Sequence, residues 1–335
     1  MSQYAAKKSA VSEADQLRAL EIIDKISKSY SAKVVGQESL RTSLLVALIA
    51  NGHIMLESVP GLAKTLAANT LADAVQALFH RIQCTPDLLP SDIVGTQIYD
   101  AASGTFNTQL GPVHANFVLL DEINRSSAKT QSAMLEAMQE RQTTIGGVMY
   151  KLPKPFLVMA TQNPIEQEGT YELPEAQLDR FIIKEIVDYP SPEDELEVLK
   201  RLDSGVFDDG EERPAASIDD VLFLQETAKK VHIADAIRNY IVSLIFITRN
   251  PKEYIGEKMA SYIEYGSSPR GTIAFVQASR ALALMDGRDY VIPDDVKKLS
   301  HKILRHRVLL NYEADADRVR SEQVIDAIVN SIPAP

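Results

Sequence analysis

Two adjacent residues, Lys64 and Thr65, lie in a short segment whose composition suits phosphate binding. The segment SVPGLAKT (58–65) separates an apolar run at 53–56 from a helical pattern that starts at residue 65. A phosphate-binding loop needs a turn whose backbone N–H groups converge on the phosphates, a lysine for the β- and γ-phosphates, and a Ser or Thr hydroxyl for Mg²⁺. Ser58 and Ala63 stand where the strict pattern has glycine. On this segment alone, an ordinary loop that ends in Lys-Thr therefore remains an open alternative.

A pair of carboxylates, Asp121 and Glu122, follows the apolar run FVLL at 117–120. A buried parallel strand delivers its C-terminal residues to the sheet edge where ligands bind. Asp121 is suited to hold Mg²⁺ through water, and Glu122 to polarise a water for attack on the γ-phosphate. The alternative is a strand followed by a solvated acidic turn, and the phosphate-binding segment upstream weakens it.

A third apolar run, FLVMAT at 156–161, leads into Gln162 and Asn163. If this strand lies between the other two, Asn163 could orient the attacking water or contact the γ-phosphate. Taken alone, Asn163 is better explained as a turn residue before Pro164.

The elements that must position these residues alternate between strands and helices up to about residue 190. Strands are predicted at 53–56, 81–85, 116–120, 156–161 and 181–187, and helices at 12–30, 38–51, 65–78 and 129–141. This alternation predicts a parallel sheet in a layered α/β domain. Pro190, Pro192 and the acidic stretch to Arg213 are interpreted as a boundary and loop, and helices are predicted at 218–232, 234–248, 271–286 and 293–303. We therefore expect an α/β domain at 1–190, and a linker with a helical domain at 191–335.

Two inserts within the first domain have hairpin patterns, at about 87–114 and at 143–152. Such hairpins could line a pore or touch a substrate protein, and a pair of solvent loops is an equal alternative. Cys84, just ahead of the first insert, is expected to be a small buried hydrophobe. Gln83 or Thr85 could couple the sensing of a substrate to Glu122.

Composition and charge narrow the classes of function. At about 100–200 residues per domain, the 335 residues indicate two domains. The balance of 35 Lys and Arg against 46 Asp and Glu gives a net charge of −11, which disfavours binding to a nucleic-acid backbone. The single cysteine excludes an internal disulfide and a Cys-based zinc cage. No export signal or membrane-spanning run is seen, so we expect a cytoplasmic protein without membrane insertion.

Longer runs around these motifs resemble the MoxR family of AAA+ ATPases. They are TPDLLPSD at 85–92, GP at 111–112, DEINR at 121–125, ATQNP at 160–164 and LPEAQLDRF at 173–181. The resemblance covers about residues 35–320 and implies an AAA+ P-loop NTPase core followed by a smaller all-α lid. The family often carries Ala before the loop lysine, as Ala63 does here, whereas Ser58 departs from the usual glycine. If the turn wants a positive φ at Ser58, its Cβ would cost about 1 kcal/mol.

The resemblance also implies roles for individual positions. Those for nucleotide binding are Val34, Val35 and Gly36 near the adenine, and the Walker A residues Pro60, Gly61, Leu62, Ala63, Lys64, Thr65 and Leu66. Those for the metal and the reaction are Thr65 and Asp121 for Mg²⁺, Glu122 as the Walker B base, Asn163 as sensor 1, Arg180 as an arginine finger for a neighbouring subunit, and Arg270 as sensor 2 on the lid. A salt-bridged turn at Arg180 and a plain surface role for Arg270 remain open.

The function implied by the resemblance is Mg²⁺-dependent hydrolysis of ATP to ADP and phosphate by a homo-hexameric ring. Its turnover would drive chaperone-like remodelling or maturation of client proteins, including proteins with von Willebrand factor A domains. A nucleic-acid motor or helicase loader is one alternative, against which the net charge and the lack of a basic arm argue. A nucleotide-dependent switch with little hydrolysis is another, against which the intact Glu122, Asn163 and Arg180 argue.

Overall fold

The computed structural model describes residues 10–59, 61–164, 171–205 and 214–335. These residues form two compact units, each built from separate stretches of the chain. The core unit comprises the described parts of Ile22–Leu173 and Glu185–Leu222, and the lid unit those of Met1–Glu21, Pro174–Lys184 and Phe223–Pro335. The units are therefore interleaved in sequence, and the domain division near residue 190 stays a prediction.

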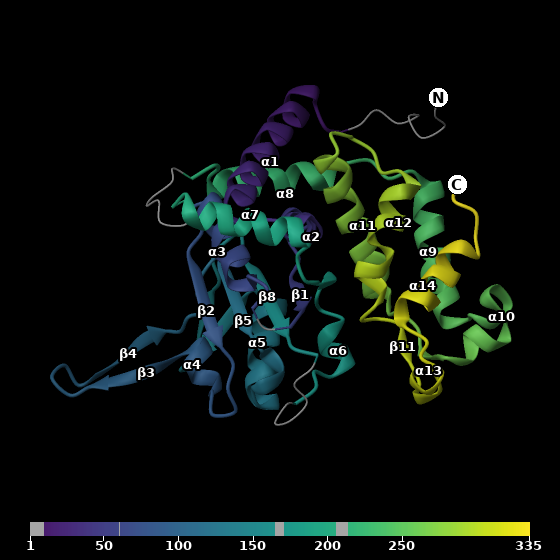
Figure 1. The fold of residues 1–335 in the computed structure, drawn as a ribbon. Coiled ribbons are helices and arrows are strands. Elements are labelled where there is room, and N and C mark those ends of the chain that lie inside the picture. Colours follow the sequence, from purple (N-terminus) through teal and green to yellow (C-terminus); the bar gives the residue numbers. More distant parts are fainter. Residues whose placement is uncertain (1–9, 60, 165–170, 206–213) are drawn as a thin grey trace. The chain divides into compact units, whose positions relative to one another are not determined.

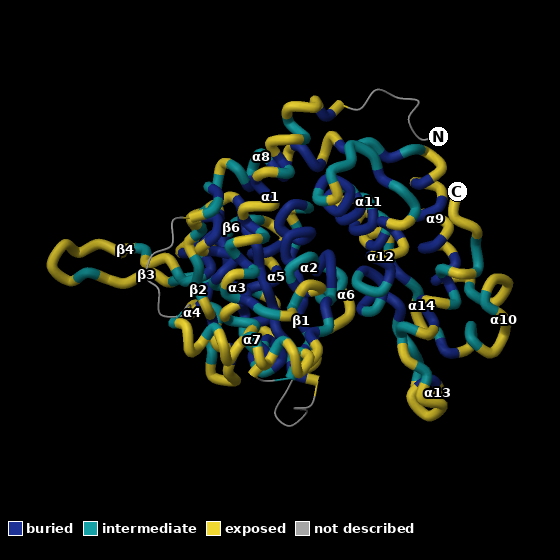
Figure 2. Tube along the Cα trace, turned by 45° about the horizontal axis from the view of Figure 1, so that its top comes forward, coloured by how far each residue is buried: buried dark blue, intermediate teal, exposed yellow. Residues whose placement is uncertain are grey.

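The centre of the core unit is a five-stranded sheet in the order β2-β5-β8-β1-β9 (Figure 1). Its strands are β1 (Ile54–Glu57), β2 (Phe79–Gln83), β5 (Phe117–Asp121), β8 (Leu157–Gln162) and β9 (Ile183–Ile186). β2 pairs with β5, β5 with β8, and β8 with β1, all in parallel. The three central strands are almost wholly buried, as the dark tube in Figure 2 shows. Burial on both faces explains why these strands are continuous apolar runs rather than alternating ones.

Helices and a short 3₁₀ turn accompany the strands as the alternating pattern predicts. They are α1 (Glu13–Lys33), α2 (Glu38–Ile49), α3 (Lys64–Ala74), α4 (Pro90–Val94), η1 (Ile123–Arg125), α5 (Ala128–Glu140), α7 (Pro192–Asp203) and α8 (Ile218–Lys230). The predicted helices at 12–30, 38–51, 65–78 and 129–141 correspond to α1, α2, α3 and α5. α4 was not predicted.

The expectation of a loop from Pro190 to Arg213 is wrong for its first half, which is helix α7. The hydroxyl of Ser191 accepts a hydrogen bond from the N–H of Asp194 as the N-cap, and Pro192 occupies the first turn, where a missing N–H costs no hydrogen bond. Acidic residues fill the first turn and basic ones the last, which complements the helix dipole. Pro192 thus starts a helix instead of ending the structure.

Both predicted hairpins are present. The first pairs β3 (Gly95–Asp100) with β4 (Thr105–Leu110), and the second pairs β6 (Gln142–Ile145) with β7 (Val148–Lys151), each antiparallel. Glycines with positive φ make the turns, with values of 67° at Gly104, 57° at Gly146 and 82° at Gly147. Figure 1 shows the β3–β4 hairpin extending away from the sheet of the core unit.

The lid unit is mainly helical, as expected. It contains α6 (Glu175–Leu178), α9 (Asp235–Arg249), α10 (Lys252–Ser261), α11 (Pro269–Met285), α12 (Pro293–Leu304), α13 (Tyr312–Ala316) and α14 (Ser321–Asn330). One short antiparallel pair, β10 (Ile263–Tyr265) with β11 (Leu309–Leu310), departs from the all-α expectation. The predicted fold class, an α/β core followed by a smaller helical lid, is otherwise confirmed. In the part of the chain that the structure describes, every helix is too short or too polar to cross a bilayer.

Candidate functional site

The predicted phosphate-binding turn joins β1 to α3 in the core unit. Gly61 has a φ of 86° with open space around the position of a Cβ, and Ala63 caps α3 in the left-handed region with a φ of 51°. The expectation of a positive φ at Ser58 is wrong, because Ser58 continues the β1 ladder by donating its N–H to the Gln162 carbonyl at 3.1 Å. The strained position is therefore Ala63. Pro60 lies outside the described residues.

Lys64 is the first residue of α3, and its ammonium lies over this turn. Nζ donates to the carbonyl oxygens of Ser58 and Val59 at 3.3 and 3.4 Å. Partial burial lowers the pKa of Lys64, and the charges of Asp121 and Glu122 oppose that shift. A phosphate that enters the turn would give the ammonium a charged acceptor in place of two carbonyls.

The two carboxylates at the end of β5, Asp121 and Glu122, are joined through Thr161 on β8. The Thr161 hydroxyl donates to Oδ1 of Asp121 at 2.8 Å and accepts the Glu122 N–H at 2.8 Å. The other oxygen of Asp121 accepts from the Arg81 guanidinium on β2 at 2.6 Å. Asp121 is thus fixed in orientation by a strand on each side of β5.

The side chain of Glu122 has cationic and amide neighbours. Oε2 is 3.0 Å from Nε of Arg125 and accepts a long hydrogen bond, 3.4 Å, from the Gln83 amide. Gln83 therefore contacts Glu122, whereas the coupling of substrate sensing to Glu122 through Gln83 or Thr85 stays a prediction. Glu122 has a φ of 57°, in the left-handed region.

Asn163 completes this edge. It follows β8, which lies between β5 and β1 as expected, and it is buried. Four neighbouring parallel strands therefore contribute to this edge: Gln83 ends β2, Asp121 ends β5, Asn163 follows β8, and the Lys64 turn follows β1. The carboxyl ends of parallel strands form the ligand edge of an α/β sheet.

A cavity of about 390 Å³ adjoins the turn within the core unit. It is lined by Lys33, Val34, Val35, Gln37, Gly61, Leu62, Ala63, Leu66, Pro190, Glu195, Val198 and Leu199. Val34 and Val35 lie there as predicted, but Gly36 does not line the cavity. A Cβ at Gly36 would lie 2.3 Å from Cγ of Asp194 on α7. The absence of a side chain at Gly36 therefore allows Asp194 to pack against its backbone. Volume and apolar lining suit the base of a nucleotide.

Helix α7 contributes Glu195, Val198 and Leu199 to the cavity wall. This contribution was not predicted from the sequence. The signal that could have found it is the Ser-Pro-Glu-Asp start of that helix, with Asp194 reaching back to the Ser191 N–H at 3.3 Å as a capping box.

A Mg²⁺ ion would find few protein ligands at this edge, which fits its chemistry. Among the residues that the structure describes, no three His, Cys, Asp or Glu side chains are grouped for a metal. Mg²⁺ keeps several waters and typically takes one or two carboxylates together with substrate phosphates. Thr65 and Asp121 can supply that minimal set.

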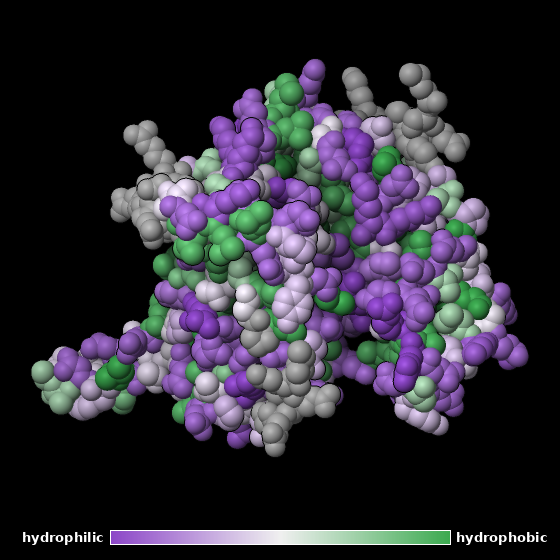
Figure 3. Space-filling model, in the orientation of Figure 1, coloured by the Kyte–Doolittle hydropathy of each residue, from purple (hydrophilic) through white to green (hydrophobic). Residues whose placement is uncertain are grey.

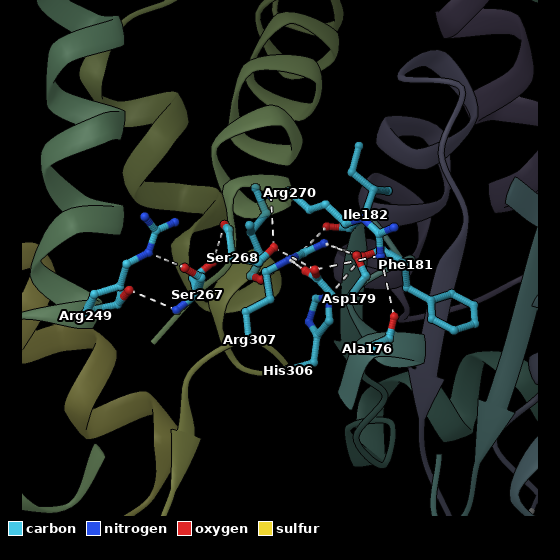
Figure 4. A network of polar contacts seen from close by, with 12 residues as sticks. Ala176, Asp179, Phe181, Ile182, Arg249, Ser267, Ser268, Arg270, His306 and Arg307 are labelled. Carbon is cyan, nitrogen blue, oxygen red and sulfur yellow. Dashed lines mark hydrogen bonds and ion pairs between the residues drawn. The ribbon is translucent and has the colours of Figure 1, made fainter. Parts of the chain in front are cut away.

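The structure places the two remaining predicted residues, Arg180 and Arg270, in the lid unit. Arg180 lies between α6 and β9 and is half-buried. Arg270 is in the first turn of α11, with its side chain 45% exposed and Nη1 3.9 Å from Oδ2 of Asp179. Figure 4 shows Arg270 and the residues that flank Arg180 in one polar network.

The fold and the ligand edge define a P-loop nucleotide-binding core with a helical lid, which is the AAA+ class. A sequence model described as "ATPase family associated with various cellular activities (AAA)" matches residues 53–183, and one described as "AAA lid domain" matches 257–328. The chain belongs to the MoxR family of AAA+ ATPases, as the following relatives show.

Chaperone MoxR1 of Mycobacterium tuberculosis is 49% identical over 90% of this chain and 79% of its own length. The uncharacterised protein YeaC of Bacillus subtilis is 43% identical over 94% of this chain and 95% of its own. A crystal structure from Cytophaga hutchinsonii, assigned as an ATPase, superimposes with a TM-score of 0.91 at 47% identity, covering 96% of this chain and 98% of that one.

Proposed function

We propose that this chain is a Mg²⁺-dependent ATPase that converts ATP to ADP and phosphate. The observation that carries the proposal is the convergence of Lys64, Asp121, Glu122 and Asn163 at the carboxyl edge of one parallel sheet. Phosphoryl transfer needs little covalent help from a protein and depends on charge placed around the γ-phosphate. A cation, two carboxylates and an amide are the groups for that task.

Each group has a role in the proposal. The adenine lies in the cavity beside Val34, Val35 and α7, and the phosphates lie over Gly61 and Lys64. Thr65 and Asp121 would hold Mg²⁺, which would supply Lewis-acid stabilisation of the charge on the phosphates. Glu122 polarises the attacking water, and Asn163 orients that water or contacts the γ-phosphate.

The proposed oligomer follows from the arginines. Arg180 reaches the site of a neighbouring subunit as an arginine finger, and Arg270 acts as sensor 2. An arginine supplied in trans is worth about 10³–10⁵ in rate, so an isolated subunit would be nearly inert. We propose a homo-hexameric ring and a cytoplasmic location on the family resemblance.

The proposed client is a protein, remodelled or matured at the expense of ATP. Support comes from the relative named a chaperone and from the β3–β4 hairpin, where Ile98, Tyr99 and Phe106 are each at least half exposed. The rings of Tyr99 and Phe106 lie 5.2 Å apart, and Figure 3 shows hydrophobic residues among polar ones on this projection. The net charge of −11 favours a protein over nucleic acid. Proteins with von Willebrand factor A domains are candidate clients.

Replacing the base tests hydrolysis directly. Glu122→Gln should keep ATP binding and lose turnover by at least about a hundredfold, since proton transfer contributes about 10²–10⁴ in rate. Glu140→Gln, on the exposed end of α5, is the matched control. Normal turnover in Glu122→Gln would refute the proposed base. Stimulation of the ATPase by DNA or RNA, with none by candidate proteins, would instead favour a nucleic-acid motor.

A further inference from the structure

The turn that carries the proposed base is tied to helix α5 by one buried side chain. Gln131, in the first turn of α5, is 1% exposed, and its Nε2 donates to the carbonyl oxygens of Ile123 at 3.3 Å and Ser126 at 3.2 Å. Ile123 begins the 3₁₀ turn η1 and Ser126 follows it, and Glu122 is the N-cap of this turn. All of these residues lie within the core unit.

The backbone of Glu122 needs such support from its surroundings. Its φ of 57° and ψ of 54° lie in the left-handed region, which is unfavourable for a residue with a Cβ and persists only where neighbouring groups hold it. On the amino side, the Thr161 hydroxyl accepts the Glu122 N–H at 2.8 Å. On the carboxyl side, Gln131 and the Ser126 hydroxyl both donate to the Ile123 carbonyl, at 3.3 and 2.8 Å. The direction in which the Glu122 carboxylate leaves the backbone therefore depends on the bonds that fix η1.

The same amide also holds the chain that follows Asn163. Nε2 of Gln131 donates to the Tyr171 carbonyl at 3.1 Å, and the Tyr171 N–H donates to the Asn124 carbonyl of η1 at 2.7 Å. Both backbone groups of Tyr171 are thus bound, one to α5 and one to the turn after the proposed base. The stretches of chain that follow Glu122 and Asn163 are therefore joined at Gln131.

Packing alone does not explain a glutamine at this position. A buried amide is unfavourable unless its polar atoms are bonded, and Oε1 of Gln131 has no hydrogen-bond partner among the residues that the structure describes. Methionine is similar in length and would fill the space without that cost. The property that glutamine supplies here is consequently the Nε2 donor, whose acceptors lie in the turn of the base and in the chain after Asn163.

We propose that Gln131 is a positioning residue for hydrolysis, which acts through Glu122 by holding η1 against α5. Its Nε2 is committed to three carbonyl oxygens, so its part is to keep the carboxylate of the base in place, not to exchange a proton. The Lys64 turn follows a different strand and does not depend on these bonds. The proposal rests on the role proposed for Glu122 above.

The first test removes the three donated bonds at nearly constant side-chain length. Gln131→Met should lower kcat at least about tenfold, because displacing a catalytic group by about 1 Å costs up to about a hundredfold. The Kd of a fluorescent ATP analogue should change less than about twofold, because the groups that bind the nucleotide keep their positions. An unchanged kcat, or a matching loss of affinity at equal folded fraction, would overturn the proposal.

Two variants are matched controls for the loss of a buried hydrogen bond. Thr130→Val removes the bond that the neighbouring residue of α5 donates to the Leu88 carbonyl at 2.6 Å. Asn116→Leu removes a buried amide just before β5, at the opposite end of the strand, which donates to the Pro155 carbonyl at 3.0 Å. In both, kcat should change less than about twofold at equal folded fraction, checked by circular dichroism. A loss in either control as large as that in Gln131→Met would overturn the proposal.

A double-variant cycle with Glu122→Gln tests whether Gln131 acts through the base. Gln131→Met should lower turnover at least about tenfold when Glu122 is present and less than about twofold in the Glu122→Gln background, where no base remains to be positioned. The slow turnover of that background can be followed with radiolabelled ATP under single-turnover conditions. Equal fold losses in the two backgrounds would contradict an action through Glu122.

Ser126→Ala is the second variant, in case Gln131→Met folds poorly. It leaves α5 unchanged and removes the other side-chain bond to the Ile123 carbonyl. Its kcat should fall at least about threefold, and this loss should again disappear in the Glu122→Gln background. An unchanged kcat, or a loss that persists in that background, would overturn the proposal. The proposed function fails in a different way, by an inactive wild type or by normal turnover in Glu122→Gln itself.

Discussion

Because His53 is buried, we expect the free energy of unfolding of the core unit to fall strongly at acid pH. The ring is 5% exposed, its Nδ1 accepts the Val158 N–H at 3.0 Å, and its Nε2 donates to the Met138 carbonyl at 3.3 Å. Burial lowers its pKa to about 3, and the charge of Arg141 adds to the shift. Protonation would also place a hydrogen on the nitrogen that accepts from Val158.

The direction and size follow from proton linkage. The unfolded chain takes up the proton below about pH 6.5, and the folded chain only near pH 3, so the contribution of His53 is complete above pH 6.5 and is lost as the pH falls toward 3. At 1.36 kcal/mol for each pH unit, about 2 kcal/mol of stability is lost between pH 7 and pH 5.

His53→Gln is the variant to measure, because an amide can accept from Val158 and donate to Met138 without titrating in this range. The assay is urea unfolding followed by circular dichroism at pH 7 and pH 5, since the chain has no tryptophan. The variant should lose about 2 kcal/mol less stability than the wild type between these pH values. Equal losses in the two proteins would refute the reasoning.

Three further predictions concern the ligand edge of the sheet, where the carboxyl ends of its strands lie. Ala63→Gly should stabilise the nucleotide-free protein by about 0.5–1 kcal/mol in urea unfolding, because the φ of Ala63 is 51°, while Ser58→Gly should not stabilise it. Cys84 is buried and its pKa is raised to about 12, so the native protein should resist maleimide at pH 8 and react once unfolded. Arg81→Met should reduce the Mg²⁺ concentration for half-maximal binding of a fluorescent ATP analogue about twofold to fivefold, because the half-exposed ion pair with Asp121 no longer competes.

The ligand edge could be predicted from the sequence because its strands are short apolar runs, each followed by a polar residue. Asp121, Glu122 and Asn163 follow two such runs, and parallel pairing places the ends of both runs at the same edge of the sheet. Burial on both faces removes the alternation that would otherwise mark a strand, so the run itself is the signal.

The wall contributed by α7 and the contacts of Arg307 could not be predicted in the same way. Pro190 and Pro192 suggested a break, although proline is also favoured at the first turn of a helix, and only the Ser191 cap distinguishes the two. Arg307 contacts residues more than 120 positions earlier in the chain. A basic residue after a helix is ordinarily explained by the helix dipole, which needs no distant partner.

The left-handed backbone at Glu122 lowers the stability of the folded protein at the residue proposed as the catalytic base. A non-glycine residue in that region stores about 1–2 kcal/mol of strain, and here it stands where the sheet edge meets solvent, at the proposed base. Selection for stability alone would favour glycine at position 122, whereas the proposed hydrolysis would require the glutamate. Stabilised descendants found by random mutagenesis without an activity screen should therefore accumulate Glu122→Gly, and such a recurrence would mark the position as one where stability has been given up for chemistry.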